Sequence, residues 1–559
     1  MSGTLKALGA TVVLWLIWAA ALFYPGGLAV SQHEGDTIHL IDIVERMALG
    51  QVPHLDFMTP IGAGAFWPIA VLVGAGLSMG QAFVVSQVVL GGLIALAATW
   101  VASARMPWGW ALALGALTVV TVMALMHGTD DLAVSVSMHY NRWAWGVSFV
   151  VLTMVVIPSE GRGPGIEGVL LGLGMAALLM VKVTYFAAIL PIVIVLALLT
   201  GQRGVLLIGV ASGLALVALL TLLLGVDFWL AYLGDLLAVA RSEVRPQPGL
   251  PITQIVTGAG YVAGTVVAFA MLVTLRRTGF ESEGLFVLMF FGAGAYITYQ
   301  NFGNDPLWMA YLALLLGVWA GMQTEERPQW TLAMGAVALA AMIASSVINL
   351  GISPFRHALL DRDKYVPALM GTDRHQDLVL LIPRANVLKA DIALGRGAAP
   401  FIGLPEPGED AAAEDAPVVF RGRTLEDCNA TGSAAYFANI ARDLAAQGLA
   451  QGAAIFMMDI LNPLWLYGDH PPLAGGAPWH YDDLPGIEAA DFVLLPTCPV
   501  RSESVALLVE DMDGVPLTEV AERPLYILYA RPSGGGEREI ERQDTAQGEA
   551  QGEAVAGRP

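Results

Sequence analysis

The sequence predicts an α-helical polytopic membrane protein that ends in a small α/β domain outside the cytoplasm. Three observations predict this fold class. Of the 559 residues, 56% are hydrophobic and only 14% are charged, so the chain lacks the polar surface that a soluble protein of this length needs. Apolar segments of membrane-spanning length follow one another up to about residue 350. After residue 354 the pattern changes to short strand-like runs.

Eleven segments have the composition of a transmembrane helix, which needs about 20 residues to cross. They are residues 8–30, 81–103, 108–127, 143–157, 166–181, 184–200, 205–225, 252–275, 284–300, 307–322 and 330–350. We expect the first to be a retained helix, because no small-residue cleavage site followed by a soluble domain is present. Residues 61–79 are rich in glycine and contain Pro68, and we expect them to insert only partly.

Basic residues set the expected orientation. Lys6 precedes the first segment, and Arg105, Arg203 and the Arg276–Arg277 pair lie in short turns. Cytoplasmic loops carry an excess of Lys and Arg. All of these residues lie inside if residues 61–79 do not cross. The N-terminus is therefore predicted to be cytoplasmic and the C-terminal domain extracytoplasmic, or periplasmic in a Gram-negative cell.

The region after residue 354 is typical of an α/β domain. Its strand-like runs are LVLLIP, APVVF, AAIFMMDI, ADFVLLP and LYILYARP. The stretch SAAYFANIARDLAAQGLA predicts an amphipathic helix that ends at Gly448. The predicted organisation is a membrane domain over residues 1–352, an α/β domain over 353–532 and a disordered tail over 533–559.

Charge and cysteine content exclude several classes of protein. The net charge of −20 offers no basic face for phosphates, which argues against a nucleic-acid partner. Two cysteines exclude a disulfide-rich scaffold and a cysteine-based metal cluster. Cys428 and Cys498 both fall in the domain predicted to lie outside, where oxidation is favoured. The sequence leaves open whether they form a disulfide or stay as thiols.

The segment after the first hydrophobic helix concentrates ionisable groups beside the membrane, where they suggest function more often than chance. They are His33, Glu34, Asp36, His39, Asp42, Glu45, His54 and Asp56. Apolar spacing predicts a short amphipathic helix over residues 36–49 that lies on the membrane surface and ends at Gly50. The alternative is a solvated loop whose charges have no role.

This segment resembles the first external loop of the GT-C glycosyltransferases, enzymes that take a sugar from a polyprenyl-phosphate carrier. The similar branch contains the protein O-mannosyltransferases and the lipid A aminoarabinose transferase, as in glycosyltransferase family 39. The matching residues are Glu34, Asp36, Gly50, Pro53, His54, Asp56, Phe57 and Pro60. The family has adjacent acids, whereas Gly35 separates them here, so the resemblance leaves open which carboxylate is catalytic. It implies that His54 and Asp56 contact substrate.

Two later stretches carry the same resemblance. Asp130 and Asp131 precede the run HYNRW, which contains His139, Asn141 and Arg142 and is similar to the second external loop of some bacterial members. Helix capping and an interfacial aromatic belt explain the same residues without function. The stretch GMAALLMVKVTYFAAILP resembles a family segment whose lysine, here Lys182, faces the carrier phosphate. A lysine that merely snorkels to the interface is the alternative.

Further candidates are less specific. Arg241 and Arg245 in the fourth external loop, residues 226–250, suit either a phosphate contact or a solvated face. The polar run QNFGNDP at 300–306 suits a turn. No zinc-protease or phosphate-loop motif is present in the sequence. The first-loop histidines and acids suit a divalent ion, but the resembled branch generally uses none, so no cofactor is expected.

The resemblance implies an inverting transferase at the extracytoplasmic face of the bacterial inner membrane. Asp36 or Glu34 would take the proton of the acceptor hydroxyl. Lys182 would stabilise the leaving polyprenyl phosphate, and the acceptor would be a lipid, a glycan or a protein. Two other classes stay open. A secondary transporter predicts paired halves and helices broken at the midplane, and a membrane scaffold or sensor would use the outer domain as a binding module.

Overall fold

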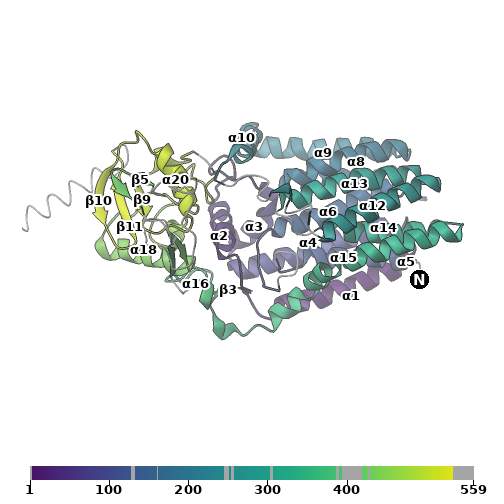
Figure 1. The fold of residues 1–559 in the computed structure, drawn as a ribbon, viewed down its shortest axis with the longest axis horizontal. Coiled ribbons are helices and arrows are strands. Elements are labelled where there is room, and N and C mark those ends of the chain that lie inside the picture. Colours follow the sequence, from purple (N-terminus) through teal and green to yellow (C-terminus); the bar gives the residue numbers. More distant parts are fainter. Residues whose placement is uncertain are drawn as a thin grey trace, which may run out of the picture. The chain divides into compact units, whose positions relative to one another are not determined.

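The structure is a computed structural model (Figure 1). It describes residues 3–126, 132–159, 161–244, 251–253, 257, 259–301, 306–385, 389–392, 418–425, 428–481 and 483–532. The predicted tail at 533–559 lies outside these residues.

The chain divides into two compact units. The membrane unit comprises Met1–His33, Ile61–Leu230 and Gln247–Arg362, and the C-terminal unit comprises Glu34–Pro60, Ala231–Pro246 and Asp363–Pro559. The sequence pattern assigns the loop at 31–60 to the membrane domain. The structure instead groups most of this loop, and a second segment around residue 240, with the C-terminal residues.

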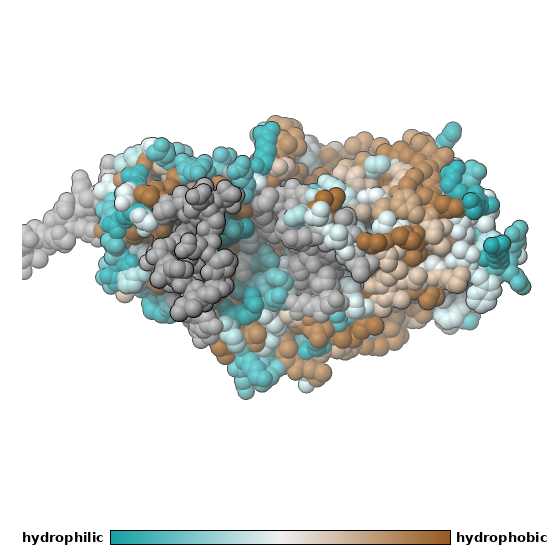
Figure 2. Space-filling view, in the orientation of Figure 1, coloured by the Kyte–Doolittle hydropathy of each residue, from teal (hydrophilic) through white to brown (hydrophobic). Residues whose placement is uncertain are grey.

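Each of the eleven predicted apolar segments is largely helical. The helices of the membrane unit are α1 (Gly3–Phe23), α3 (Trp67–Gly74), α4 (Met79–Ala102), α5 (Trp108–Val122), α6 (His139–Val156), α7 (Pro164–Val181), α8 (Val183–Leu199), α9 (Arg203–Leu224), α12 (Ala259–Arg277), α13 (Glu281–Gln300), α14 (Trp308–Met322) and α15 (Glu326–Ala358). Among the described helices, α1, α4, α7, α9 and α15 are long and apolar enough to cross a membrane. The space-filling view shows a largely apolar surface over these helices (Figure 2). The chain is thus a multi-pass membrane protein by length and composition, and the count of eleven spans stays a prediction.

Two segments end earlier than their hydropathy predicts. Helix α1 stops at Phe23, because Pro25 and Gly26, which has a φ of +72°, follow it, and residues 28–30 form the strand β1 (Leu28–Val30). Helix α3 has eight residues, or about 12 Å of helix at 1.5 Å per residue, which is less than half the hydrocarbon thickness. A helix of that length is too short to cross the membrane, and partial insertion of residues 61–79 stays a prediction.

Glycines allow two of the long helices to approach closely. Gly168 and Gly172 of α7 face Gly209 and Gly213 of α9, and a Cβ atom at Gly172 would overlap the carbonyl oxygen of Gly209. This is the small-xxx-small pattern by which membrane helices gain van der Waals contact, since lipid tails offer no hydrophobic drive for helix pairing.

The C-terminal unit contains the predicted α/β domain. Its main sheet has the order β10 (Thr518–Glu522), β11 (Tyr526–Ala530), β9 (Phe492–Pro496) and β8 (Ile455–Met457). Strands β8 and β9 are parallel, and the other two pairs are antiparallel. All residues of β9 and β11 are buried, as the continuous apolar runs predict. Helix α18 (Ser433–Gln447) ends at Gly448, whose φ is +66°, as predicted.

Smaller pieces complete this unit. They are α2 (Glu34–Ala48), α10 (Asp227–Arg241), which begins in the membrane unit, α16 (Ile382–Ala385), α19 (Leu464–Tyr467), α20 (Ser502–Asp511), β2 (Tyr365–Pro367), β3 (Leu378–Leu381), β4 (Lys389–Ile392), β5 (Val419–Phe420), β6 (Arg423–Thr424) and β7 (Cys428–Thr431). Pairs β2–β3, β4–β7 and β5–β6 are antiparallel. The region 226–250 is therefore not simply a loop, because α10 occupies most of it.

Helix α2 matches the predicted short helix and excludes the alternative of a solvated loop. Every residue from Thr37 to Arg46 is buried, including the charged ones, and α2 packs against α18 of the same unit. Gly50, with a φ of +94°, follows its end as predicted. A helix with buried charges needs partners for them, and the C-terminal residues supply these partners.

Candidate functional sites

Lys182 separates two helices of the membrane unit. It is an extended residue, with φ −158° and ψ 110°, between the end of α7 and the start of α8. Its Nζ donates hydrogen bonds to Asn141 Oδ1 at 2.9 Å and to Asn301 Oδ1 at 2.7 Å. The same nitrogen lies 5.2 Å from the centre of the Tyr140 ring, within cation–π range. The side chain is therefore positioned from three directions.

The partners of Lys182 come from other helix ends. Asn141 is in the first turn of α6, and Asn301 follows the last residue of α13. Asn301 also donates weakly to the Tyr185 hydroxyl at 3.4 Å. The resemblance predicts Lys182 and Asn141 as candidate donor-binding residues, and in the structure the two side chains are hydrogen-bonded to each other. Asn301 lies in the run that the sequence suggests is a turn, so its role emerges only from packing.

Two other predicted residues on α6 are part of the core. His139 is 2% exposed, its Nε2 is 2.9 Å from the carbonyl oxygen of Ala65, and Phe66, Phe83 and Trp143 surround its ring. Arg142 is fully buried and donates to the carbonyl oxygen of Ser137 at 3.2 Å. These contacts connect the start of α6 to neighbouring backbone.

The opposite end of α7 contains a different kind of polar group. Arg105, just after α4, donates to both carboxylate oxygens of Glu167 in the first turn of α7, at 2.8 and 2.7 Å. Ser159 donates to the same carboxylate at 3.1 Å. Arg162 lies 3.8 Å above the Trp100 ring. Bidentate arginine–carboxylate pairs are among the strongest polar contacts in proteins. This pair therefore holds the chain after α4 against the first turn of α7.

The two candidate catalytic acids lie in the first turn of α2. Glu34 Oε2 accepts a hydrogen bond from Arg384 Nε at 3.0 Å, within the C-terminal unit. Asp36 is half-buried. Carboxylates stabilise a helix N-terminus, because the unpaired N–H groups there create a partial positive charge. Both acids therefore contribute to the start of the helix in addition to any chemistry.

Later acids of α2 have tight partners in the same unit. Asp42 pairs with Arg46 at 2.6 Å and accepts from the Trp465 indole at 3.0 Å. Glu45 binds Arg374 and His375. Burial alone would raise the pKa of Glu45, but the His375 hydrogen bond and the Arg374 charge outweigh it and lower that pKa. These groups fix α2 within its unit.

The predicted G-x-x-P-H-x-D-F segment forms a tight turn. Asp56 Oδ2 accepts the N–H of Val52 at 2.6 Å, so it stabilises this turn. His54 has a φ of +73°, and its Nδ1 lies 2.8 Å from Asp235 Oδ2 of α10. His54 also stacks on Tyr232, with ring centres 4.3 Å apart. A positive φ at a non-glycine residue persists only where the surrounding structure imposes it. At His54 this structure is α10, which contributes Asp235 and Tyr232.

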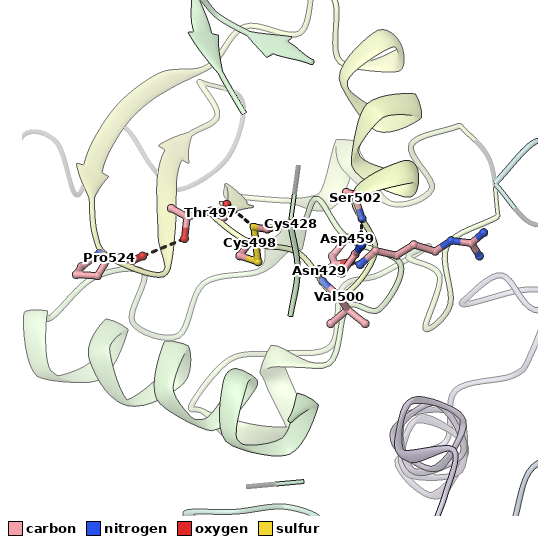
Figure 3. Close-up of a disulfide and its surroundings, with 9 residues drawn as sticks. Cys428, Asn429, Asp459, Thr497, Cys498, Val500, Ser502 and Pro524 are labelled. Carbon is pink, nitrogen blue, oxygen red and sulfur yellow. Dashed lines mark hydrogen bonds between the residues drawn. A yellow bond between two sulfur atoms is a disulfide. The ribbon is translucent and has the colours of Figure 1, made fainter. Parts of the chain in front are cut away.

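The C-terminal unit contains a disulfide, with the hydrogen-bonded carboxylate of Asp459 among its surroundings (Figure 3). Cys428 and Cys498 are bonded, with Cα atoms 5.4 Å apart, which confirms the disulfide alternative. Asp459 accepts backbone N–H groups of Ile460, Val500 and Arg501 at 2.7, 2.6 and 3.2 Å. Burial nevertheless raises the pKa of Asp459 to about 7.

The remaining predicted residues are placed as follows. Arg241 is exposed in the last turn of α10. Asp130, Asp131 and Arg245 lie outside the described residues. Within the described part of the chain, no group of three or more His, Cys, Asp or Glu side chains is arranged to hold a metal ion.

Comparison with known proteins gives no family assignment. No protein-family model matches the sequence, and no curated protein or solved structure matches it. A functional assignment therefore depends on the residues themselves and on the loop resemblance.

Proposed function

We propose that this protein is a membrane glycosyltransferase that moves a sugar from a polyprenyl-phosphate donor to a lipid, glycan or protein acceptor on the extracytoplasmic side. The observation that carries the proposal is the position of Lys182. Its ammonium is held by Asn141 and Asn301 at the junction of helix ends. Two amide oxygens hold the ammonium in a fixed position at these helix ends, and a cation in a fixed position suits a site that receives a phosphate.

The proposal assigns each group one role. Lys182 stabilises the negative charge that develops on the carrier phosphate as the glycosidic bond breaks. A carboxylate of the first loop takes the proton of the acceptor hydroxyl as its oxygen attacks the anomeric carbon. Asp36 is our first choice for this base, and Glu34, which accepts a hydrogen bond from Arg384, is the second.

The deciding experiment compares a deletion strain with strains complemented by variants. Mass spectrometry of envelope glycolipids and glycoproteins should show one glycan lost on deletion and restored by the wild-type chain. Asp36→Asn keeps the size of the side chain and removes its basicity, so transfer should fall about 10²–10⁴-fold, the usual contribution of a general base.

The purified full-length protein provides the matched measurement, with a panel of polyprenyl-phosphate sugars as donors. Asp513→Asn changes an exposed acid of the same unit and should transfer normally. Glu34→Gln should show the larger loss if Glu34 is the base. If both first-loop variants transfer at the wild-type rate, this loop is not the catalytic centre and the proposed function is wrong.

A further inference from the structure

Helix α10 has an unusual distribution of side chains. Leu230, Leu233 and Leu237 are spaced three and four residues apart, which places them on one face of the helix. They are 63%, 54% and 46% exposed. Val226, one turn earlier, is 62% exposed and continues this apolar face.

The opposite face of α10 is buried. Phe228, Tyr232 and Val239 are 0%, 3% and 9% exposed. Asp235 lies on this face, where it accepts from the Thr59 N–H at 3.1 Å and pairs with His54. A helix at a water-facing surface has the reverse arrangement, with polar residues outward and leucines inward. The outward leucines of α10 therefore need an apolar environment.

The chain leading into α10 indicates which environment this is. Among the described helices, α9 is one of the five candidate membrane spans, and two of its last three residues, Leu222 and Leu223, are 84% and 68% exposed. Only two residues separate α9 from α10. Trp229 donates its indole N–H to Thr221 of α9 at 2.8 Å, which fixes the bend between the helices. The apolar residues of α10 thus follow shortly after the exposed apolar end of a candidate membrane span in the sequence.

Charge at the far end of α10 agrees with a membrane interface. Arg241 is exposed and lies four residues after Leu237, so it extends the same face. Helices that lie in the interfacial plane combine an apolar face with basic residues that reach lipid phosphates. Tryptophan is likewise enriched at this depth.

We propose that α10 is an interfacial helix whose Leu230–Leu233–Leu237 face is embedded in the bilayer surface, with Arg241 at the headgroups. The occupant of this surface is membrane lipid. The buried face of α10 carries Asp235, which pairs with His54 of the G-x-x-P-H-x-D-F turn. A bilayer that holds α10 in place would therefore also hold this turn in place. This inference does not depend on glycosyl transfer.

Fluorescence quenching tests the proposal in the full-length protein, reconstituted in vesicles of phosphatidylcholine and phosphatidylglycerol. Leu233→Cys and Leu237→Cys each carry one environment-sensitive label, added without reductant so that the Cys428–Cys498 disulfide does not react. Leu222→Cys serves as the lipid-exposed control and Asp513→Cys as the water-exposed control. Phospholipids with a shallow nitroxide quench labels in the bilayer, and iodide quenches labels in water.

Interfacial helices lie roughly 5–10 Å into the headgroup and acyl boundary, so the shallow nitroxide should reduce emission at positions 233 and 237 about twofold. Iodide should quench these labels far less than the label at 513. Equal iodide quenching at 233 and 513 would overturn the proposal, because it would place the face in water. Protection from both quenchers would also overturn it, because a protein surface, such as a second copy of this chain, would then cover α10.

Discussion

The two ends of α7 hold charged side chains in opposite ways. At its first turn, Glu167 receives two hydrogen bonds from Arg105 and one from Ser159, so donors surround both carboxylate oxygens. Just past its last residue, Lys182 donates to the amide oxygens of Asn141 and Asn301. The bidentate pair of Arg105 and Glu167 joins two opposite charges with matched geometry, whereas the two amide contacts of Lys182 fix the position of its ammonium and carry no net charge themselves. The two ends therefore differ in the chemistry of these partners, and the predictions below test whether they also differ in role.

The largest expected effect is at Glu167. Glu167→Gln leaves Arg105 buried without its counter-charge, and breaking a buried pair costs about 3–5 kcal/mol. The thermal unfolding midpoint of the detergent-solubilised protein should fall steeply. The apparent affinity of the surviving folded protein for the proposed polyprenyl-phosphate sugar donor should stay unchanged. A large change in donor affinity with no loss of stability would contradict the structural role.

Asp459 is a third kind of charged group, a buried carboxylate whose hydrogen-bond partners are backbone N–H groups. Its pKa is raised from an ordinary value of 3.8 to about 7 by burial. The folded state therefore binds a proton that the unfolded state releases, and Asp459 makes stability fall as pH rises from about 4 to about 7, by a few kcal/mol in order of magnitude.

Asp459→Asn cannot ionise and should remove this dependence. Its amide NH2 would face a backbone N–H that now meets a carboxylate oxygen, so the variant should be less stable than the wild type near pH 4.5, and this difference in thermal unfolding should narrow toward pH 8. Glu45, with a lowered pKa, loses its contribution only as pH falls below its ordinary range. Parallel stability–pH curves for wild type and variant would show that Asp459 is ionised in the folded protein.

At Lys182 the expected effect is on binding. A hydrogen bond to a charged group contributes about 1.5–3 kcal/mol, so Lys182→Ala should weaken apparent donor affinity about 10- to 100-fold. Lys182→Arg keeps the charge but not the fit between Asn141 and Asn301, and should recover part of the affinity. Donor titrations with the purified variants measure both. Wild-type affinity in Lys182→Ala would show that this end of α7 is as structural as the other.

The smallest expected effect is at Arg162, which is stacked on Trp100 beside the Glu167 group. Cation–π contacts contribute about 0.5–1 kcal/mol at exposed sites, so Arg162→Gln should lower the unfolding midpoint only slightly. A loss as large as that of Glu167→Gln would mean that Arg162, rather than Arg105, is the main counter-charge of the carboxylate.

Several differences from the sequence-based expectations have identifiable causes. The pattern over residues 226–250 suggests an external loop because this stretch contains Pro246 and Pro248, although the spacing of Leu230, Leu233 and Leu237 is a helical signal. Hydropathy extends the first segment to residue 30, because Leu28, Ala29 and Val30 are apolar in a strand as much as in a helix. Amphipathic spacing predicts α2 but not the burial of its charges, since their partners Arg374 and Trp465 are more than 300 residues away in sequence.

Local sequence pattern was enough to predict the long apolar helices, α2, α18 and the strands β8, β9 and β11. Apolar runs, glycines such as Gly50 and Gly448, and prolines act within a few residues, so these elements are readable from local pattern. Which polar groups meet depends instead on how the elements pack. The pairs Lys182–Asn301, His54–Asp235 and Glu34–Arg384 are separated by 119, 181 and 350 residues. Such contacts arise from the packing of whole helices and domains, and no periodicity in a single chain segment encodes them.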